Sequence, residues 1–220
     1  KMDVWGVDRA VTQHIATSVH AMHKVNDFAA SVRSERLYAF GSVHPDAPDA
    51  LEELERCARL PHVRGIKLHF GNSGVDLRNP DHVASIARVF AAANARRLPI
   101  VVHLKTRATD YGGRDAQVFL DDILPMAPDI VVQVAHMAGS GPGYPAFADQ
   151  AFEVLAEAIA RNDPRTQNVI FDVATVVTMD TSPETAELIA RRVRQVGVGR
   201  FVFGADLAIG EDGNPPPRQA

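Results

Sequence analysis

The sequence has a single cysteine, no long hydrophobic run and no cluster of like charges. Cys57 has no second cysteine with which to form an internal disulfide, which fits a reducing compartment, and we expect a cytoplasmic protein. No apolar run approaches the roughly 18 residues that indicate a membrane-spanning helix. The formal net charge is -4 and no stretch is rich in Lys and Arg. We therefore expect neither nucleic acid nor a membrane as a partner.

Both ends of the sequence look incomplete. The chain begins with Lys1 instead of a methionine, and residues 1–6 read as the last turn of a helix that Gly6 closes. The sequence ends in a proline-rich stretch, residues 210–220, soon after its last strand-like run. We therefore expect that further residues precede Lys1 and follow Ala220.

Strand-like and helix-like stretches alternate along the whole chain. The strand-like stretches are rich in β-branched and apolar residues, and the helical ones carry apolar residues at helical spacing. The predicted strands are 7–15, 37–43, 63–70, 99–105, 130–137, 168–175 and 200–206, and the predicted helices are 22–33, 48–60, 80–97, 114–125, 147–161 and 183–196. This alternation indicates parallel strands that are joined by right-handed crossovers.

Two architectures have this element order, an open doubly wound sheet and a closed (β/α)8 barrel. No glycine-rich phosphate-binding fingerprint follows the first strand, where a dinucleotide-binding sheet would have one. Polar residues instead follow the ends of several strands, as in the active sites of barrels. With no long linker in the sequence, we predict one α/β domain over residues 1–220. It is a (β/α)8 TIM barrel that lacks its first strand and its last helix.

Three predicted strands end in a side chain that can bind a metal ion. His103 ends the run LPIVVHLK, His136 ends DIVVQVAHM, and Asp206 ends RFVFGAD. Imidazole and carboxylate groups suit zinc or another divalent cation, which lowers the pKa of a bound water molecule. We therefore predict a divalent metal, with zinc as the expected ion, that His103 and Asp206 bind. Asp206 would also accept the proton of the bound water.

A lysine in the third strand is expected inside the barrel. Side chains alternate across a strand, so in GIKLHF Lys67 shares the interior face with Gly65 and His69. Lysine is almost never fully buried without a partner. Lys67 therefore either pairs with a carboxylate such as Asp172 or contacts the substrate.

Arginines and histidines elsewhere admit two interpretations. Arg107 and Arg114 follow the His103 strand and could hold a substrate carboxylate through two hydrogen bonds each, or they could simply be solvated loop residues. His20 and His23 form an H-x-x-H pair, whose spacing indicates an exposed face more than a metal pair.

The runs GIKLHF, IVVHLK, VVQVAHMAG, VIFDVAT and RFVFGAD together resemble the metal-dependent amidohydrolase superfamily. The resemblance is to the amidohydrolase-2 branch, which also contains carboxymuconate-semialdehyde-type decarboxylases. It implies a distorted (β/α)8 barrel with one divalent metal, often zinc. In this family an H-x-H pair on the first strand, a histidine that ends the fifth and an aspartate that ends the eighth bind the metal.

By motif position, the resemblance assigns His103 and Asp206 as metal ligands. His136 matches the histidine that polarises the substrate or assists proton transfer. When the missing first strand is counted, Lys67 lies on the fourth strand of the barrel, where binuclear relatives carry a carboxylated lysine. Because this branch binds a single metal, Lys67 is not expected to be a ligand. The sequence contains no H-x-H pair, so we expect the segment as given to bind metal weakly and to be inactive if it stands alone.

Four functions remain open from the sequence. The first is a hydrolase, in which metal-activated water attacks an amide, ester or lactone of a small-molecule substrate. The second is a decarboxylase of a small aromatic or unsaturated carboxylic acid on the same fold. The third is a lyase that forms an imine at Lys67 or Lys105. The fourth is a non-catalytic barrel remnant, whose unpaired strand edges would favour association with a partner or into a homo-oligomer.

Overall fold

Seven parallel strands form the centre of the computed structural model, which describes residues 2–32 and 34–206. The strands lie in the order in which they occur along the chain, and each pairs with the next in parallel register. They are β1 (Ala10–Gln13), β2 (Leu37–Ser42), β3 (Val63–His69), β4 (Ile100–His103), β5 (Val132–Val134), β6 (Val169–Asp172) and β7 (Phe201–Val202). All seven predicted strands are confirmed, although most are shorter than the runs that predicted them.

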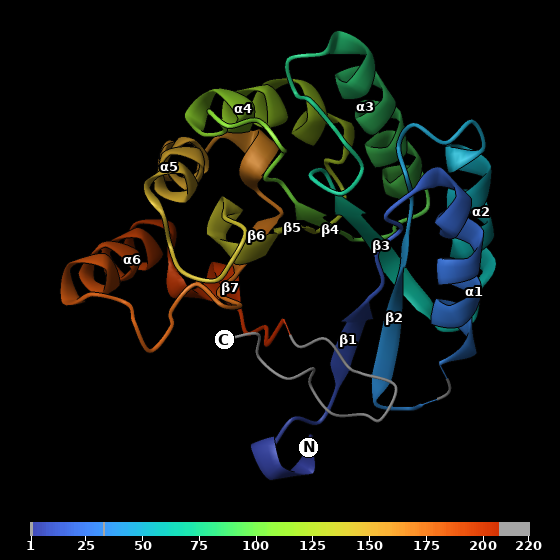
Figure 1. The fold of residues 1–220 in the computed structure, drawn as a ribbon, viewed down its shortest axis with the longest axis horizontal. Helices are drawn as coiled ribbons and strands as arrows, with labels where there is room; N and C mark the ends of the chain where they lie inside the picture. Colours follow the sequence, from blue (N-terminus) through green and yellow to red (C-terminus); the bar gives the residue numbers. More distant parts are fainter. Residues whose placement is uncertain (1, 33, 207–220) are drawn as a thin grey trace.

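The helices cover the outer side of the sheet. They are α1 (Met22–Ser31), α2 (Ala50–Arg59), α3 (Pro80–Ala95), α4 (Gly113–Val118), α5 (Ala146–Ala160) and α6 (Pro183–Val196). Figure 1 shows the strands following one another along an arc, with the helices outside it and with β1 and β7 at its two ends. Among the described residues no pairing joins β1 to β7. The fold is therefore a partial (β/α)8 barrel, as predicted.

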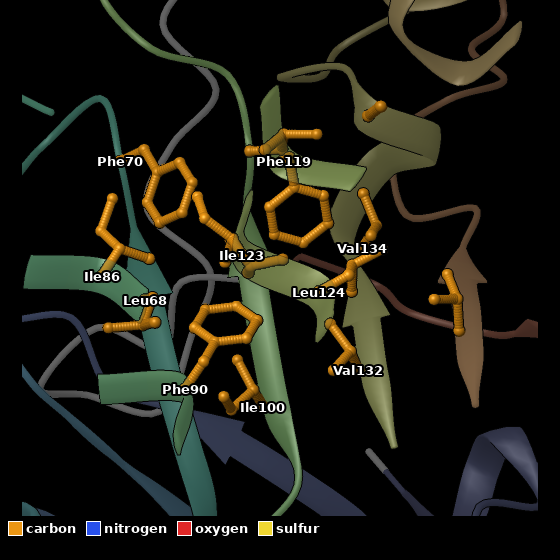
Figure 2. Packing of buried hydrophobic residues seen from close by; sticks show 14 of the residues in the cluster. Leu68, Phe70, Ile86, Phe90, Ile100, Phe119, Ile123, Leu124, Val132 and Val134 are labelled. Atoms are coloured by element: carbon orange, nitrogen blue, oxygen red, sulfur yellow. The ribbon is translucent and has the colours of Figure 1, made fainter. Parts of the chain in front are cut away.

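The main core lies between the sheet and the helices. Ile66 and Leu68 of β3 belong to this core. Figure 2 shows Leu68 among large side chains from α3 and from the segment after α4. The rings of Phe90 and Phe119 meet edge to face with centroids 5.8 Å apart. Burial of these apolar surfaces is the main favourable contribution to folding, and it leaves the alternate residues of each strand to line the inner side.

The inner side of the sheet contains a few apolar side chains. Phe40, Val101 and Ala135 form a small second cluster there. A Cβ atom at Gly65 would lie 2.5 Å from the ring of Phe40 and 2.7 Å from the backbone oxygen of Pro99. Only glycine fits at this position, and the alternation predicted for β3 is confirmed.

Two predicted elements differ from those in the structure. The predicted helix 114–125 is α4 followed by a π-helical turn, Phe119–Ile123, and a 3-10 turn, Leu124–Met126. The predicted strand 130–137 stops at Val134, and a turn with positive φ angles follows it.

Cys57 is buried in the core. No helix in the described part of the chain is long and apolar enough to span a membrane.

Candidate functional site

Polar side chains gather where four neighbouring strands end. His69 is the last residue of β3, His103 of β4 and Asp172 of β6, and His136 lies two residues after the end of β5. Because all strands run in parallel, these ends lie at the same edge of the sheet. In barrels of this kind the active site lies at this edge.

Three histidine rings are in contact at this edge. His69 and His103 are partners in the β3–β4 register, and their rings stack with centroids 3.9 Å apart and an interplanar angle of 12°. The ring of His136 meets His103 at 5.4 Å and 68°. His103 is therefore held between two other imidazoles, each from an adjacent element.

Burial keeps two of these rings unprotonated. It lowers the pKa of His103 to about 2, and the neighbouring His69 and Lys67 act in the same direction. The pKa of His69 falls to about 4, again mainly through burial and then through the charge of Lys67. Nδ1 of His103 is buried and has no hydrogen-bond partner in the described part of the chain. His103 thus offers a nitrogen lone pair at neutral pH.

His136 lies in a left-handed turn that fixes which ring nitrogen carries the proton. The φ angles of His136, Met137 and Ala138 are 53°, 49° and 62°. Nδ1 of His136 lies 2.9 Å from the backbone oxygen of Ala174, and a carbonyl oxygen can only accept. The proton of the neutral ring is therefore on Nδ1, which leaves the lone pair on Nε2.

His69 has the opposite arrangement. Its Nδ1 accepts a hydrogen bond from the backbone N–H of Asn72 at 3.2 Å, so the proton of the neutral ring is on Nε2. Nε2 of His69 can therefore donate a hydrogen bond, whereas Nε2 of His136 can accept one. The sequence placed His69 in the interior by strand alternation, but it gave no signal for this tautomer, which depends on a loop hydrogen bond.

Lys67 is the buried cation of the site. Its side chain is 4% exposed, and no carboxylate in residues 2–32 and 34–206 lies within the 4.0 Å of an ion pair with it. Burial lowers its pKa to about 8, while the charges of Asp172 and Asp206 oppose this change. Lys67 and Asp172 therefore interact through space, and the direct ion pair considered from the sequence is not formed.

Asp172 is the buried carboxylate of the site. It is 4% exposed, and it accepts hydrogen bonds from Nε2 of Gln133 at 2.7 Å, from the backbone N–H of His136 at 3.0 Å and from that of Ala174 at 3.1 Å. Asp172 thus connects β5, the turn at His136 and the loop after β6.

The other predicted site residues lie at the margin or outside. Asp206 is exposed, with a φ angle of 47°, and it is close enough to oppose the lowering of the Lys67 pKa. Arg107 is exposed, and its charge contributes last among the causes that affect the His69 pKa. Arg114 is exposed on α4, and no described contact brings it to the three histidines.

A divalent metal fits part of this site. His103 is a neutral imidazole with a buried nitrogen that has no partner among the described residues, as a metal ligand requires. Within the described ranges, however, no three His, Cys, Asp or Glu side chains are arranged so that they could hold an ion together. The described residues alone therefore do not complete a metal site.

Comparison with known proteins gives a family and a fold. A family model described as amidohydrolase matches residues 2–220. Among curated proteins, none matches the sequence. Many solved structures do match, and three of the most similar are considered below.

The first is a TIM-barrel protein from Bordetella bronchiseptica, with 14% identity and a TM-score of 0.59; the match covers 92% of this chain and 66% of that one. The second is an amidohydrolase from Burkholderia multivorans with bound zinc (14% identity, TM-score 0.60, coverage 93% and 70%). The third is a 5-carboxyvanillate decarboxylase from Novosphingobium aromaticivorans with bound manganese (17% identity, TM-score 0.58, coverage 92% and 68%). The chain spans about two thirds of the length of these proteins.

Proposed function

This chain belongs to the amidohydrolase family, and we propose that it acts as a metal-dependent hydrolase of small amides, esters or lactones. The observation that carries the proposal is the histidine cluster at the carboxyl edge of the sheet. It combines neutral rings with fixed proton positions, a buried cation and a buried carboxylate. Such preorganised groups in a site of low polarity are what the transfer of protons and the stabilisation of charge require.

In this proposal His103 and Asp206 bind the divalent ion. The ion would polarise the carbonyl group and activate water. Zinc and manganese are both candidates because one similar amidohydrolase contains zinc and one similar decarboxylase contains manganese. The described residues supply no third ligand, so the site requires water or further protein groups to complete it.

The side chains of this chain would guide the proton. Water adds to the carbonyl carbon, and its proton passes to Asp206 or to Nε2 of His136, which carries a lone pair. The same proton then reaches the leaving nitrogen or oxygen as the carbon–heteroatom bond breaks. Nε2 of His69, which carries a proton, is suited to donate to the oxygen on which negative charge develops.

Lys67 favours a second candidate, the decarboxylation of a small aromatic or unsaturated carboxylic acid. A buried ammonium group that has no ion-pair partner in the described part of the chain is suited to bind a substrate carboxylate. In this reaction the carbon–carboxyl bond breaks, carbon dioxide leaves and a proton takes its place on carbon. The same cation would bind the carboxylate of a hydrolase substrate, so product analysis must decide. Arg107, which is exposed near His69, would assist, and we propose a weaker role of the same kind for Arg114.

The experiment combines metal analysis with product analysis. The purified protein, in its full-length form, is loaded with zinc or manganese and incubated with a panel of amides, esters, lactones and carboxylic acids. We expect hydrolysis products and metal retention, and we expect His103→Ala and Asp206→Ala to lose both. His20→Ala, at an exposed histidine outside the site, is the matched control. Release of carbon dioxide would refute the hydrolase proposal and support the decarboxylase. Metal retention in both site variants would refute the assignment of His103 and Asp206 as metal ligands.

A further inference from the structure

We propose that Asp172 is a positioning residue, which holds His136 in the conformation that presents its Nε2 lone pair to the site. The role of His136 in proton transfer rests on the proposed function above. The role of Asp172 in fixing His136 rests on geometry alone, so the two are tested separately.

The turn at His136 needs external support. His136, Met137 and Ala138 all have positive φ angles, and none of them is glycine, so each residue is in a conformation that L-amino acids rarely adopt. Such backbone is kept only where the surrounding contacts determine it, and it is common at functional sites. The turn has one internal hydrogen bond, from the backbone N–H of Gly139 to the oxygen of His136 at 2.8 Å.

The ring of His136 is fixed by a hydrogen bond to Ala174, and one oxygen of Asp172 binds the backbone of both residues. Oδ1 accepts from the backbone N–H of His136 at 3.0 Å and from that of Ala174 at 3.1 Å. The carbonyl oxygen of the same Ala174 accepts the hydrogen bond from Nδ1 of His136 at 2.9 Å. Removal of this carboxylate therefore frees the backbone that carries the ring and also the residue to which the ring donates.

Asp172 acts through the backbone, not through the ring. The distance from Nδ1 of His136 to Oδ1 of Asp172 is 3.7 Å, which is too long for a hydrogen bond. The arrangement differs from a catalytic triad, in which the carboxylate accepts directly from the imidazole. The second oxygen, Oδ2, accepts from Gln133 at 2.7 Å and anchors the carboxylate to β5.

Three substitutions separate the hydrogen bonds of Asp172 from its charge. In Asp172→Asn the amide oxygen can still accept from both backbone N–H groups, provided that the amide of Gln133 rotates to face the new NH2 group. In Asp172→Ala both hydrogen bonds and the charge are lost. Asp172→Glu keeps the charge but moves the oxygens by one methylene group. Asp163→Ala is the matched control, because Asp163 also accepts from a backbone N–H, that of Arg165, but lies in another loop.

The readout is the tautomer of His136, measured by long-range proton–nitrogen NMR on chains labelled with 15N-histidine; His136→Gln identifies the signal. We expect a single Nδ1–H tautomer in the wild type, in Asp172→Asn and in Asp163→Ala, and a mixture of tautomers in Asp172→Ala and Asp172→Glu. On a substrate that the wild type turns over, Asp172→Ala should lower kcat by about 10- to 100-fold, as expected for a residue that orients a functional side chain. Its KM should change little, and Asp172→Asn should restore most of the activity.

A pure Nδ1–H tautomer in folded Asp172→Ala would overturn the proposal. If Asp172→Ala does not fold, the same result in Asp172→Glu would overturn it. If the tautomer responds as expected while the wild type hydrolyses none of the substrates, the positioning role stands and the proposed function fails.

Discussion

Lys67→Met is expected to raise the free energy of unfolding near neutral pH. The side chain of Lys67 is 4% exposed, and its pKa is lowered from 10.5 to about 8 chiefly because burial removes water from the ammonium group. At about 1.4 kcal/mol for each pKa unit, the protonated side chain destabilises the fold by about 3 kcal/mol at pH 7. Methionine has a similar shape and no charge, so it should relieve up to this amount.

The effect must depend on pH in a defined direction. Because the pKa of Lys67 is lower in the folded chain, the unfolded chain binds more protons between about pH 8 and 10.5. The contribution of Lys67 to stability therefore rises with pH across this range. The advantage of Lys67→Met should be largest at pH 7, should shrink by pH 10 and should be absent above about pH 10.5.

Urea unfolding followed by circular dichroism at pH 7 and pH 10 would measure this. Lys105→Met is the matched control, because Lys105 is half-buried, donates to the oxygen of Thr106 at 2.9 Å and lies 5.7 Å from the ring centroid of Tyr111. Its replacement should destabilise the chain by about 1 kcal/mol, the usual value of a lost hydrogen bond. If Lys67→Met were no more stable than wild type at pH 7, or if its advantage were equal at both pH values, the reasoning would be refuted.

Three further predictions concern stability elsewhere in the chain. Phe90→Ala, at a fully buried ring, should cost about 3–5 kcal/mol and lower Tm by about 6–20 °C in a thermal scan. The pKa of His23 is raised because each of its ring nitrogens contacts a carboxylate. The contribution of His23 to the free energy of unfolding is therefore fully present below the ordinary pKa of histidine, and it is lost as the pH rises through the raised pKa. His23→Gln should therefore be less stable than wild type by under about 1 kcal/mol in urea at pH 6, with a smaller difference at pH 9. Gly141→Ala would place a Cβ atom 2.0 Å from Oγ1 of Thr175 and should cost about 1–3 kcal/mol. Gly143→Ala would meet no atom of the described residues within 4 Å and should cost less, so equal Tm values for the two variants would contradict this.

The strands and most helices could be predicted because their signals are local. Buried parallel strands read as short apolar runs, and helix ends carry their own caps. Ser182, for example, accepts the backbone N–H of Thr185 at 3.2 Å, and Gly197, with a φ angle of 94°, ends the same helix. The order of these elements then leaves few topologies to consider, which is why the partial barrel was predicted correctly.

The details of the site could not be predicted because they depend on contacts between distant segments. Asp172 and His136 are 36 residues apart, and nothing in VIFDVAT or in AHMAG signals a left-handed turn. The proton position on His69 depends on the backbone N–H of Asn72, which no side-chain pattern encodes. His23 is exposed, as the sequence predicted, but no local pattern signalled its contact with the buried carboxylate of Glu53. The roles of His103 and Asp206 as metal ligands stay predictions.

The polar groups at the carboxyl edge are difficult to explain as contributions to stability. Within the residues that the structure describes, Lys67 is buried without an ion pair and His103 keeps a buried nitrogen without a partner. Asp172 holds a turn of non-glycine residues with positive φ angles. Each feature raises the free energy of the folded state relative to an apolar alternative. Natural proteins keep such features chiefly where function needs them. Lys67→Met, near this edge of the sheet, is therefore expected to stabilise the fold and to abolish the proposed activity together.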